Sequence, residues 1–418
     1  CPICEARLQV CVAFCSARRL PTSSMPERHY KDLGLSVEVV TTSQRLSELT
    51  VDYDRLYRVA NVGLPFQLHE WHIAWWDAFA SSTLKIRDRL LFHVVRSAVD
   101  GCVGIVPLVL SERPGRGPIR IGTLALIGTD PYITELRKPT VAPGFEANVA
   151  AAVQRSLSKE SRWDWAHWTG FGPEFARALP SDGSFEPMEP SLDYVLDLAP
   201  TWDAFRGNLK RNIRESVRHC YNSLKRDGIT LEFDIAKSGD ALKSALDTFV
   251  RLHAARAGLD DTVAHPDRFA AASTRAFLYD VCQRLSARDI VRVFLLKLSG
   301  EVVAARIAFE INDSLYMYYS GYDPKWRKYS VMTTLVTEAI KYAIDRKLTT
   351  VNLSAGTDVS KTRWGARAVP FPEAMQLRAR ARSRLASKLY RTALSADRNH
   401  PVIRLLVKAL PRRNWSPS

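Results

Sequence analysis

The sequence predicts an α/β (α+β) protein in which one unit of strands and helices occurs twice along 418 residues. Each half has a β-hairpin with a tight turn, at 91–110 and again at 291–310. After each hairpin comes a strand that ends in Gly-X-Asp-Pro, with Asp130 in the first half and Asp323 in the second. Each of these strands leads to an amphipathic helix and one further strand. Because the whole order repeats, we expect a duplicated domain with a mixed twisted sheet flanked by helices in each copy.

We assign the first copy to residues 36–199 and the second to residues 200–375. Elements expected in the first are an aromatic helix at 69–80, the hairpin turning at Asp100-Gly101, a strand at 119–128, a helix from Glu146 and a strand from Trp163. Elements expected in the second are helices at 244–258 and 266–287, the hairpin turning at Ser299-Gly300, a strand at 314–321, a helix from Val331 and a strand from Thr349. Between the copies, residues 209–228 form a helix with one apolar and one basic face.

Four of the seven cysteines crowd into the first fifteen residues, and Cys1 and Cys4 have the spacing of a zinc ligand pair. No strand or helix pattern surrounds them that would hold a metal ion. We therefore expect residues 1–35 to be a disordered or non-native extension, and we predict no metal site. The other three cysteines are expected to be reduced core residues, at 102, 220 and 282.

Composition and charge limit the possible environments of the chain. With 46% hydrophobic and 25% charged residues, no apolar run approaches the eighteen residues of a spanning helix, and no secretory signal layout is evident. A cytoplasmic location is expected. Much of the net charge of +15 lies in residues 376–418, where basic amphipathic helices suit an anionic membrane surface better than a nucleic acid. The alternative is that this tail packs against the body of the protein.

The ordered set of elements resembles the GNAT acyltransferase fold, in the duplicated form of cellulose- and exopolysaccharide-associated acetyltransferases and of Fem-type peptidyltransferases. The resemblance covers about residues 36–375. The motifs that carry it are the Trp-rich helix at 69–80, "GIVPL" at 104–108, "LKRNIRESVRH" at 209–219, "RLHAARAG" at 251–258, "YSGYDPKWRKYS" at 319–330 and "NLSAGTDVSKTRWG" at 352–365. In that family the last motif has an aspartate, a glycine and Tyr-Lys, whereas this chain has Asn352, a matching Gly356 and Ser360-Lys361.

The resemblance implies that an acyl-CoA co-substrate lies between two splayed strands, 315–321 and 349–355, with its pyrophosphate at the N-terminus of the helix from Val331. Cofactor-binding residues expected there are Lys325, Arg327, Lys328, Ser330, Val331, Met332 and Asn352. Ser330 is expected to cap the helix and to leave the N–H groups of Val331, Met332 and Thr333 for a phosphate. The alternative is an ordinary capped helix beside a solvated basic loop.

Direct acyl transfer needs a base for the nucleophile and a proton for the leaving thiolate. Catalytic residues expected for these roles are Asp323, Tyr318 and Lys361, and residues expected to contact the acceptor are His253, Arg256, Asp358 and Trp364. Each has a structural alternative. Asp323 has the position of a turn-initiating residue before proline, the tyrosines can be core residues, a lone histidine on an amphipathic helix is more often structural, and Lys361 can be a solvated loop residue.

These expectations combine into an acyl-CoA-dependent N- or O-acyltransferase of exopolysaccharide or cell-envelope synthesis, acting on a small molecule, a glycan or a glycolipid. The second copy is expected to bind the donor. The first is expected to be a degenerate scaffold, because its Asp-Pro loop, Tyr132 to Glu135, lacks basic residues. Two alternatives stay open: Fem-type transfer from aminoacyl-tRNA, which the basic blocks would suit, and a non-catalytic GNAT-like binding protein.

Overall fold

The computed structural model describes residues 34–115, 120–130, 132–179, 185–259 and 265–395. The four cysteines of residues 1–15 and the last part of the basic tail lie outside these ranges. Among the described residues, Cys102, Cys220 and Cys282 are buried free thiols.

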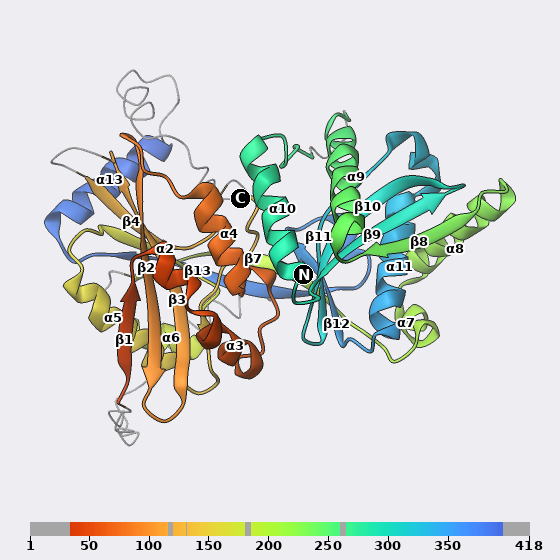
Figure 1. Cartoon of the computed structure of the whole chain (residues 1–418). Coiled ribbons are helices and arrows are strands. Elements are labelled where there is room, and N and C mark those ends of the chain that lie inside the picture. The colour runs from red at the N-terminus through yellow and green to blue at the C-terminus, as the bar shows by residue number, and fades with distance from the viewer. Residues whose placement is uncertain (1–33, 116–119, 131, 180–184, 260–264, 396–418) are drawn as a thin grey trace.

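One mixed sheet of thirteen strands runs through both halves of the chain (Figure 1). Its first-half strands are β1 (Ser36–Val40), β2 (Arg87–Ser97), β3 (Gly101–Arg113), β4 (Ile121–Leu126), β5 (Thr140–Val141) and β6 (Trp165–Thr169). The remaining strands are β7 (Phe185–Asp197), β8 (Leu231–Ala236), β9 (Val291–Leu298), β10 (Glu301–Ile311), β11 (Ser314–Tyr322), β12 (Thr350–Ala355) and β13 (Arg367–Leu377). Their order is β1-β2-β3-β4-β6-β13-β7-β12-β11-β10-β9-β8, with β5 on β3.

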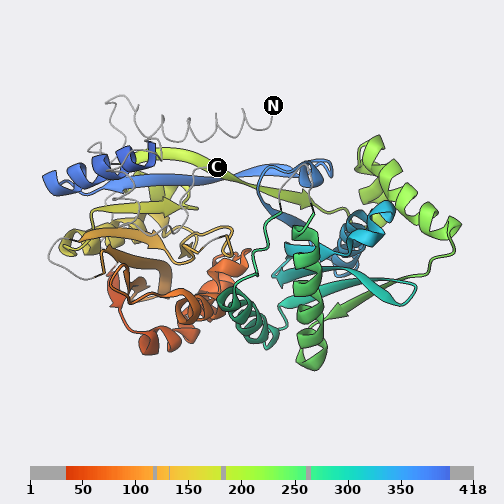
Figure 2. The same ribbon diagram turned by 90° about the horizontal axis from the view of Figure 1, so that it is seen from above.

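The two halves exchange a strand at the centre of this sheet. β7 follows β6 in the chain but pairs with β12 of the second half, while β13 ends the second half and pairs with β6 of the first. The two exchanged strands also pair with each other, from Arg367 opposite Val195 to Gln376 opposite Phe185. Figure 2 shows them as long ribbons that cross from one half to the other. The halves are therefore one hydrogen-bonded unit, and a boundary at residue 199 stays a prediction.

Helices cover both faces of the sheet. In the first half they are α2 (Ser43–Ser47), α3 (Thr50–Val59), α4 (His69–Phe79), α5 (Glu146–Lys159) and α6 (Pro173–Arg177), with the 3-10 segment η1 (Pro65–Gln67). In the second half they are α7 (Trp202–Asn208), α8 (Arg211–Arg226), α9 (Gly239–Ala257), α10 (Ala272–Ser286), α11 (Val331–Asp345) and α12 (Val359–Thr362), with η2 (Pro324–Tyr329), and α13 (Ala381–Ser395) follows β13. The α/β fold class and the duplicated order of elements are confirmed.

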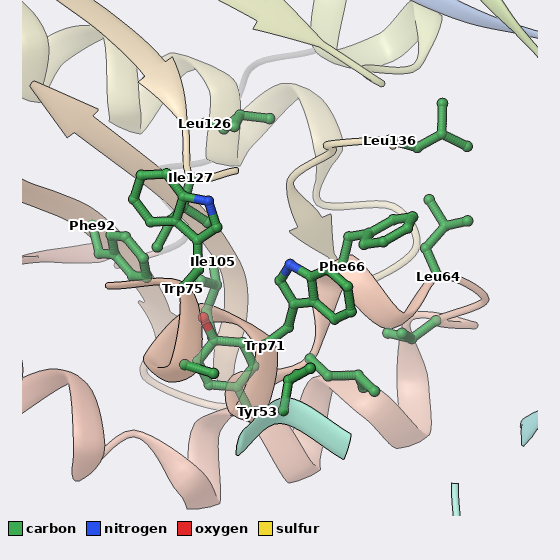
Figure 3. Close-up of a cluster of buried hydrophobic side chains, with 14 of the residues drawn as sticks. Tyr53, Leu64, Phe66, Trp71, Trp75, Phe92, Ile105, Leu126, Ile127 and Leu136 are labelled. Atoms are coloured by element: carbon green, nitrogen blue, oxygen red, sulfur yellow. The ribbon is translucent and has the colours of Figure 1, made fainter. Parts of the chain in front are cut away.

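One hydrophobic cluster contains aromatic side chains from both halves, and Figure 3 shows the part of it around Trp71 and Trp75. Trp71 and Trp75 of α4 are fully buried in it. The Trp71 ring contacts Phe277 of α10 edge-on at 5.2 Å between centroids, and Phe66 meets Tyr316 of β11 at 5.3 Å. Such aromatic pairs stabilise a core beyond their burial alone. The aromatic helix predicted from the sequence therefore packs against the second half as well as the first.

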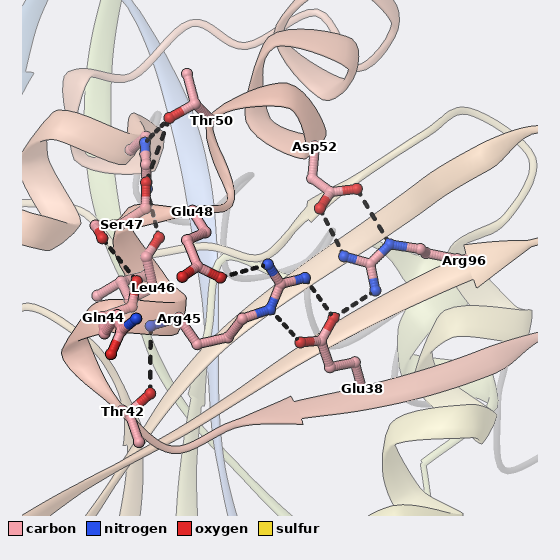
Figure 4. A network of polar contacts seen from close by, with 11 residues as sticks. Glu38, Thr42, Gln44, Arg45, Leu46, Ser47, Glu48, Thr50, Asp52 and Arg96 are labelled. Atoms are coloured by element: carbon pink, nitrogen blue, oxygen red, sulfur yellow. Dashed lines mark hydrogen bonds and ion pairs between the residues drawn. The ribbon is translucent and has the colours of Figure 1, made fainter.

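A polar network fixes the outer edge of the sheet in the first half (Figure 4). The Glu38 carboxylate of β1 accepts from Arg45 and from Arg96, each at 2.6 Å, and Arg96 also binds Asp52 of α3. The hydrogen bond from Arg45, assisted by Arg96, lowers the Glu38 pKa to about 2. Because the folded pKa is depressed, this stabilisation is present at neutral pH and is lost only as the pH falls toward 2.

The first part of the basic tail packs against the body of the protein. Arg378 donates to the carbonyl groups of Glu160 and Ser158, and the Ser383 hydroxyl donates to Asp164 at 2.9 Å. None of the described helices is long and apolar enough to cross a membrane. For residues up to Ser383, the structure favours the packing alternative over a free basic surface.

Candidate active site at the divergence of two strands

Strands β11 and β12 diverge soon after they meet. They pair in parallel over three positions, from Ser314 opposite Thr350 to Tyr316 opposite Asn352. Beyond this point β11 continues beside β10, and β12 continues beside β7. The divergence lies where the sequence predicts splayed strands, and α11 begins just after β11.

Two carboxyl groups face the last pair of this ladder. The Tyr316 hydroxyl donates to Glu135 Oε2 at 2.6 Å, and the Asn352 amide donates to Asp193 Oδ2 at 2.6 Å. Asn352 also accepts from the N–H of Ser354 at 2.7 Å through its side-chain oxygen. Glu135 comes from the first half and Asp193 from β7, so the site is assembled from three distant parts of the sequence.

Lys361 completes this polar cluster from α12. Its ammonium donates to the Ser354 hydroxyl at 3.0 Å and to the carbonyl oxygen of Ala355. Burial lowers the pKa of Lys361, and burial raises the pKa of Glu135 to about 7 although Lys361 and the Tyr316 hydroxyl oppose that rise. Burial also raises the pKa of Asp193. The cluster therefore holds acidic and basic groups whose proton affinities are shifted toward one another.

Two arginines lie on the β10 side of the divergence. Arg256 of α9 and Arg306 of β10 both donate to the Ser320 hydroxyl at 3.3 Å. Arg306 Nε is buried and has no hydrogen-bond partner among the described residues, and burial lowers the Arg306 pKa to about 10. Arg256 also contacts His265 at 2.9 Å. The Arg306 guanidinium brings positive charge near the Glu135 carboxyl group.

The N-terminus of α11 differs from the expected cap. Ser330 has φ 52° and makes no side-chain capping hydrogen bond, because it is the left-handed residue that ends η2. Its carbonyl oxygen instead accepts from the N–H of Thr333 at 2.8 Å and of Thr334 at 3.3 Å. The expected Ser330 side-chain cap is wrong, and the Thr333 N–H is already used within the helix.

A partly unsatisfied arginine lies beside this first turn. Arg363, which follows α12, donates to the Thr333 hydroxyl at 2.5 Å. Its Nε is buried and has no hydrogen-bond partner among the described residues, whereas the buried Thr334 hydroxyl interacts with the Cys220 thiol. A buried donor without a partner is costly, so Arg363 beside this helix terminus favours an anion there.

A family model identifies the domain type of most of the second half. Residues 211–362 match the family model of the acetyltransferase (GNAT) domain. This segment is a GNAT domain. Comparison with curated protein sequences finds no match.

The chain as a whole resembles the crystal structure of FemX, with a TM-score of 0.53 and 12% identity over 81% of this chain and 96% of FemX. It also matches the C-terminal domain of a putative lysylphosphatidylglycerol synthetase from Agrobacterium fabrum, with a TM-score of 0.47 and 12% identity over 84% and 97% of the two chains. A tandem GNAT protein from the clavulanic acid biosynthesis pathway matches with a TM-score of 0.42 and 14% identity, over 81% of this chain and 98% of that protein. At such identity the likeness to FemX shows the fold alone, and the predicted GNAT resemblance is confirmed for residues 211–362.

Of the residues predicted to take part in catalysis, the GNAT domain brings only Lys361 into the polar cluster. Asp323 accepts from the N–H of Lys325 at 3.0 Å and thereby caps η2, as its turn-initiating alternative requires. Tyr318 is buried, and its hydroxyl donates to the carbonyl oxygen of Ile133. These contacts favour structural roles for Asp323 and Tyr318.

Some of the residues predicted to bind the cofactor lie at the strand divergence or the start of α11, and the others lie in an exposed loop. Asn352 lies at the divergence and Val331 and Met332 lie in the first turn of α11, whereas the three loop cations are exposed. Lys328 lies 4.7 Å from the centre of the Tyr329 ring. The cationic loop is thus next to the helix terminus, and its role in phosphate binding stays a prediction.

The residues predicted to bind acceptor are mostly structural in the GNAT domain. His253 Nε2 accepts from the N–H of Arg268 at 3.3 Å, so Nδ1 donates to the Ser320 carbonyl at 3.0 Å and the ring is neutral. Burial lowers the His253 pKa in agreement with this state. Asp358 caps α12 through the N–H of Ser360, and Trp364 is buried in the core. Only Arg256 reaches the site, through Ser320.

The sequence interpretation missed Glu135 and Arg363, and it considered Tyr316 only as one of four tyrosines on a strand edge that could protonate the thiolate or pack in the core. Glu135 was noted only as part of a loop without positive charge, and nothing local in the sequence shows that this loop contacts β11. Among the described residues there is no group of His, Cys, Asp or Glu side chains arranged to hold a metal ion.

Proposed function

We propose that the protein is an acyl-CoA-dependent N- or O-acyltransferase that transfers the acyl group directly to its acceptor. The observation that carries the proposal is the divergence of β11 and β12 beside the first turn of α11, in a segment that matches the GNAT domain. A thioester that enters between the strands meets the polar cluster at Tyr316 and Asn352. Its phosphate groups then lie toward the helix terminus.

The donor site in this proposal has two anion-binding components. The first turn of α11 offers backbone N–H groups and the positive end of the helix dipole. Arg363 offers a buried Nε donor that lacks a partner among the described residues. A diphosphate would satisfy them through charge-assisted hydrogen bonds. In this proposal Lys325, Arg327 and Lys328 add a positive field from the adjacent loop.

The transfer step would use the polar cluster. Attack on a thioester carbon places negative charge on the carbonyl oxygen, and a cation held away from bulk water stabilises that charge strongly. We assign this role to Lys361, whose ammonium lies at the end of β12. In this proposal the acceptor is an amine or hydroxyl of a small molecule, glycan or glycolipid, as in exopolysaccharide or cell-envelope synthesis.

A second candidate, transfer from aminoacyl-tRNA, is favoured by one surface feature. A groove of about 660 Å³ lies along α7, α8 and α11. It is lined mainly by basic and aromatic side chains: Trp202, Arg206, Arg211, Arg214, Arg218, Tyr221 and Lys341. Arginine with aromatic rings is the usual surface for a nucleic-acid strand. None of the residues that line this groove belongs to β11 or β12, so RNA binding there would not require entry between these strands.

Calorimetric titration with acetyl-CoA and, separately, with aminoacyl-tRNA tests these proposals. We expect saturable binding of acetyl-CoA that weakens when the 3′-phosphate is removed, and no change in that affinity when Arg214 and Arg218 are both replaced by alanine. Binding of aminoacyl-tRNA alone, lost in the same double variant, would support the second candidate instead. If neither ligand binds, both enzymatic proposals fail and a non-catalytic GNAT-like binding protein remains.

The proposed setting is the cytoplasm, with membrane contact through the basic tail. The arginines at 378, 380 and 382 bind carbonyl groups of the first half, so each is held against the body of the protein. In this proposal, attraction to anionic lipids would come from the exposed Arg384 and Lys388 of α13 and from the basic residues after Ser395.

A further inference from the structure

We propose that Glu135, supplied by the first half of the chain, is the proton acceptor for acyl transfer in the GNAT domain, and that Tyr316 holds its carboxylate in place. This inference rests on the proposed acyltransferase function. It changes the role of the first half from a degenerate scaffold to a part of the active site.

The loop that carries Glu135 is fixed on both sides. From within the first half, Asp130 accepts from the N–H of Thr134 at 3.0 Å and from the Trp75 indole at 2.8 Å. From the second half, the Tyr319 hydroxyl donates to the carbonyl oxygen of Tyr132. The Tyr318 hydroxyl donates in the same way to the next carbonyl of the loop. Two adjacent residues of β11, Tyr318 and Tyr319, thus hold the loop that carries Glu135.

The direct hydrogen bond supports a catalytic carboxylate. Tyr316 is the last residue of β11 that pairs with β12, and its hydroxyl lies 2.6 Å from Glu135 Oε2. Tyr316 has no exposed surface, so its hydroxyl proton has a fixed acceptor. Glu135 itself is half-buried, so a nucleophile can approach it. A held carboxylate beside the entering thioester is the geometry that a general base needs.

Other carboxyl groups near the divergence are less suited to this role. Asp193 is held by the Asn352 amide at 2.6 Å and by the N–H of Tyr194 at 3.1 Å, two donors that stabilise its charged form. Asp323 faces away as the cap of η2. Glu135 has a hydroxyl as its partner, which can donate to the carboxylate and remain in place when the carboxyl is protonated.

The charged and titratable groups around Glu135 support proton exchange near neutral pH. They come from four elements: Tyr316, Tyr318 and Tyr319 of β11, Arg306 of β10, Asp193 of β7 and Lys361 of α12. Burial is the largest influence and raises the pKa of Glu135 to about 7, against the attraction of Lys361 and Arg306. A base with such a pKa can both take and return a proton at physiological pH.

The proposed step balances without another reactant. The neutral amine or hydroxyl of the acceptor forms a bond to the thioester carbon and gives its proton to the Glu135 carboxylate. The carbon–sulfur bond breaks, and its electron pair goes to the sulfur of coenzyme A. The resulting thiolate takes the proton from Glu135, which restores the carboxylate and leaves a thiol.

Infrared titration of the carboxyl groups tests the assignment without any acceptor. The variant Glu135→Gln keeps the shape of the side chain and an oxygen for the Tyr316 hydroxyl, but removes the acid. We expect the wild type to show a carboxylic acid band that disappears as the pH rises through about 7, and E135Q to lack it. Glu301→Gln, at an exposed strand end, is the matched control and should keep the band. No such band in the wild type above pH 5 would overturn the proposal.

Kinetics with acetyl-CoA and hydroxylamine as the probe nucleophile gives the second readout. We expect E135Q to release coenzyme A about 100-fold more slowly than the wild type and to lose the decline of rate below pH 7, since general bases contribute on this scale. Its thermal unfolding and its affinity for acetyl-CoA should be unchanged. Equal rates and pH profiles for E135Q and the wild type would overturn the inference alone. Failure of the wild type to bind acetyl-CoA would instead contradict the proposed function.

Discussion

Replacing Gly321 with alanine is expected to destabilise the GNAT domain by about 3 kcal/mol. A Cβ at this position would lie 2.2 Å from the backbone nitrogen of His253 and 2.4 Å from the carbonyl carbon of Leu252. Both atoms belong to the backbone of α9, so no side-chain rotation can relieve the clash. The glycine of the Gly-X-Asp-Pro motif is therefore required because α9 lies directly on β11. Urea unfolding followed by circular dichroism measures the effect.

Gly207→Ala is the matched control for this prediction. Gly207 lies in α7, where an added methyl group would meet no neighbouring group within 4 Å, and its backbone is not left-handed. Alanine there should leave stability unchanged or raise it by up to about 1 kcal/mol. If G321A unfolds at the same urea concentration as the wild type, the close contact between α9 and β11 is wrong.

Replacing Arg363 with alanine is expected to weaken acetyl-CoA binding by about 10- to 100-fold. A charge-assisted hydrogen bond to a phosphate contributes about 1.5–3 kcal/mol of binding free energy. The Arg363 Nε has no hydrogen-bond partner among the described residues, so it is available to donate to a phosphate. Calorimetric titration with acetyl-CoA measures the change. Thermal unfolding of R363A shows whether the domain stays folded.

Two controls make this prediction specific. Arg367→Ala removes an exposed charge paired with Asp197 and should leave the affinity unchanged. A triple variant with alanine at 325, 327 and 328 tests the loop cations that the sequence favoured. If R363A binds acetyl-CoA like the wild type and the triple variant does not, the phosphates lie on the loop rather than at Arg363.

The fold was predictable where its signals are local. The hairpin turns expected at Asp100-Gly101 and Ser299-Gly300 join β2 to β3 and β9 to β10 in the structure. The helix expected at 209–228 is α8, which buries Ile213, Val217 and Leu224 on one face as its periodicity requires. Hydrophobic periodicity and turn residues predict structure that forms between residues close in the sequence, and these hairpins and this helix are such structures.

The strand exchange and the composite site were not predictable in this way. β13 pairs with β6 although about two hundred residues separate them, and no pattern within β13 states which strand is its partner. The two Asp-Pro loops show the same limit. Asp130 is enclosed by Trp75 and Thr134, while Asp323 caps η2, so one motif has two environments. The position of Glu135 beside Tyr316 depends on how the halves pack, which no single segment of the sequence encodes.

A crystal structure of the protein with a non-hydrolysable acetyl-CoA analogue tests the central claim most directly. We predict that the pantetheine arm lies between β11 and β12 beyond Tyr316 and Asn352, that the diphosphate contacts Arg363 and the first turn of α11, and that the acyl carbon faces Glu135. An analogue bound in the basic groove of α7 and α8, or an acyl carbon remote from Glu135, would contradict the account.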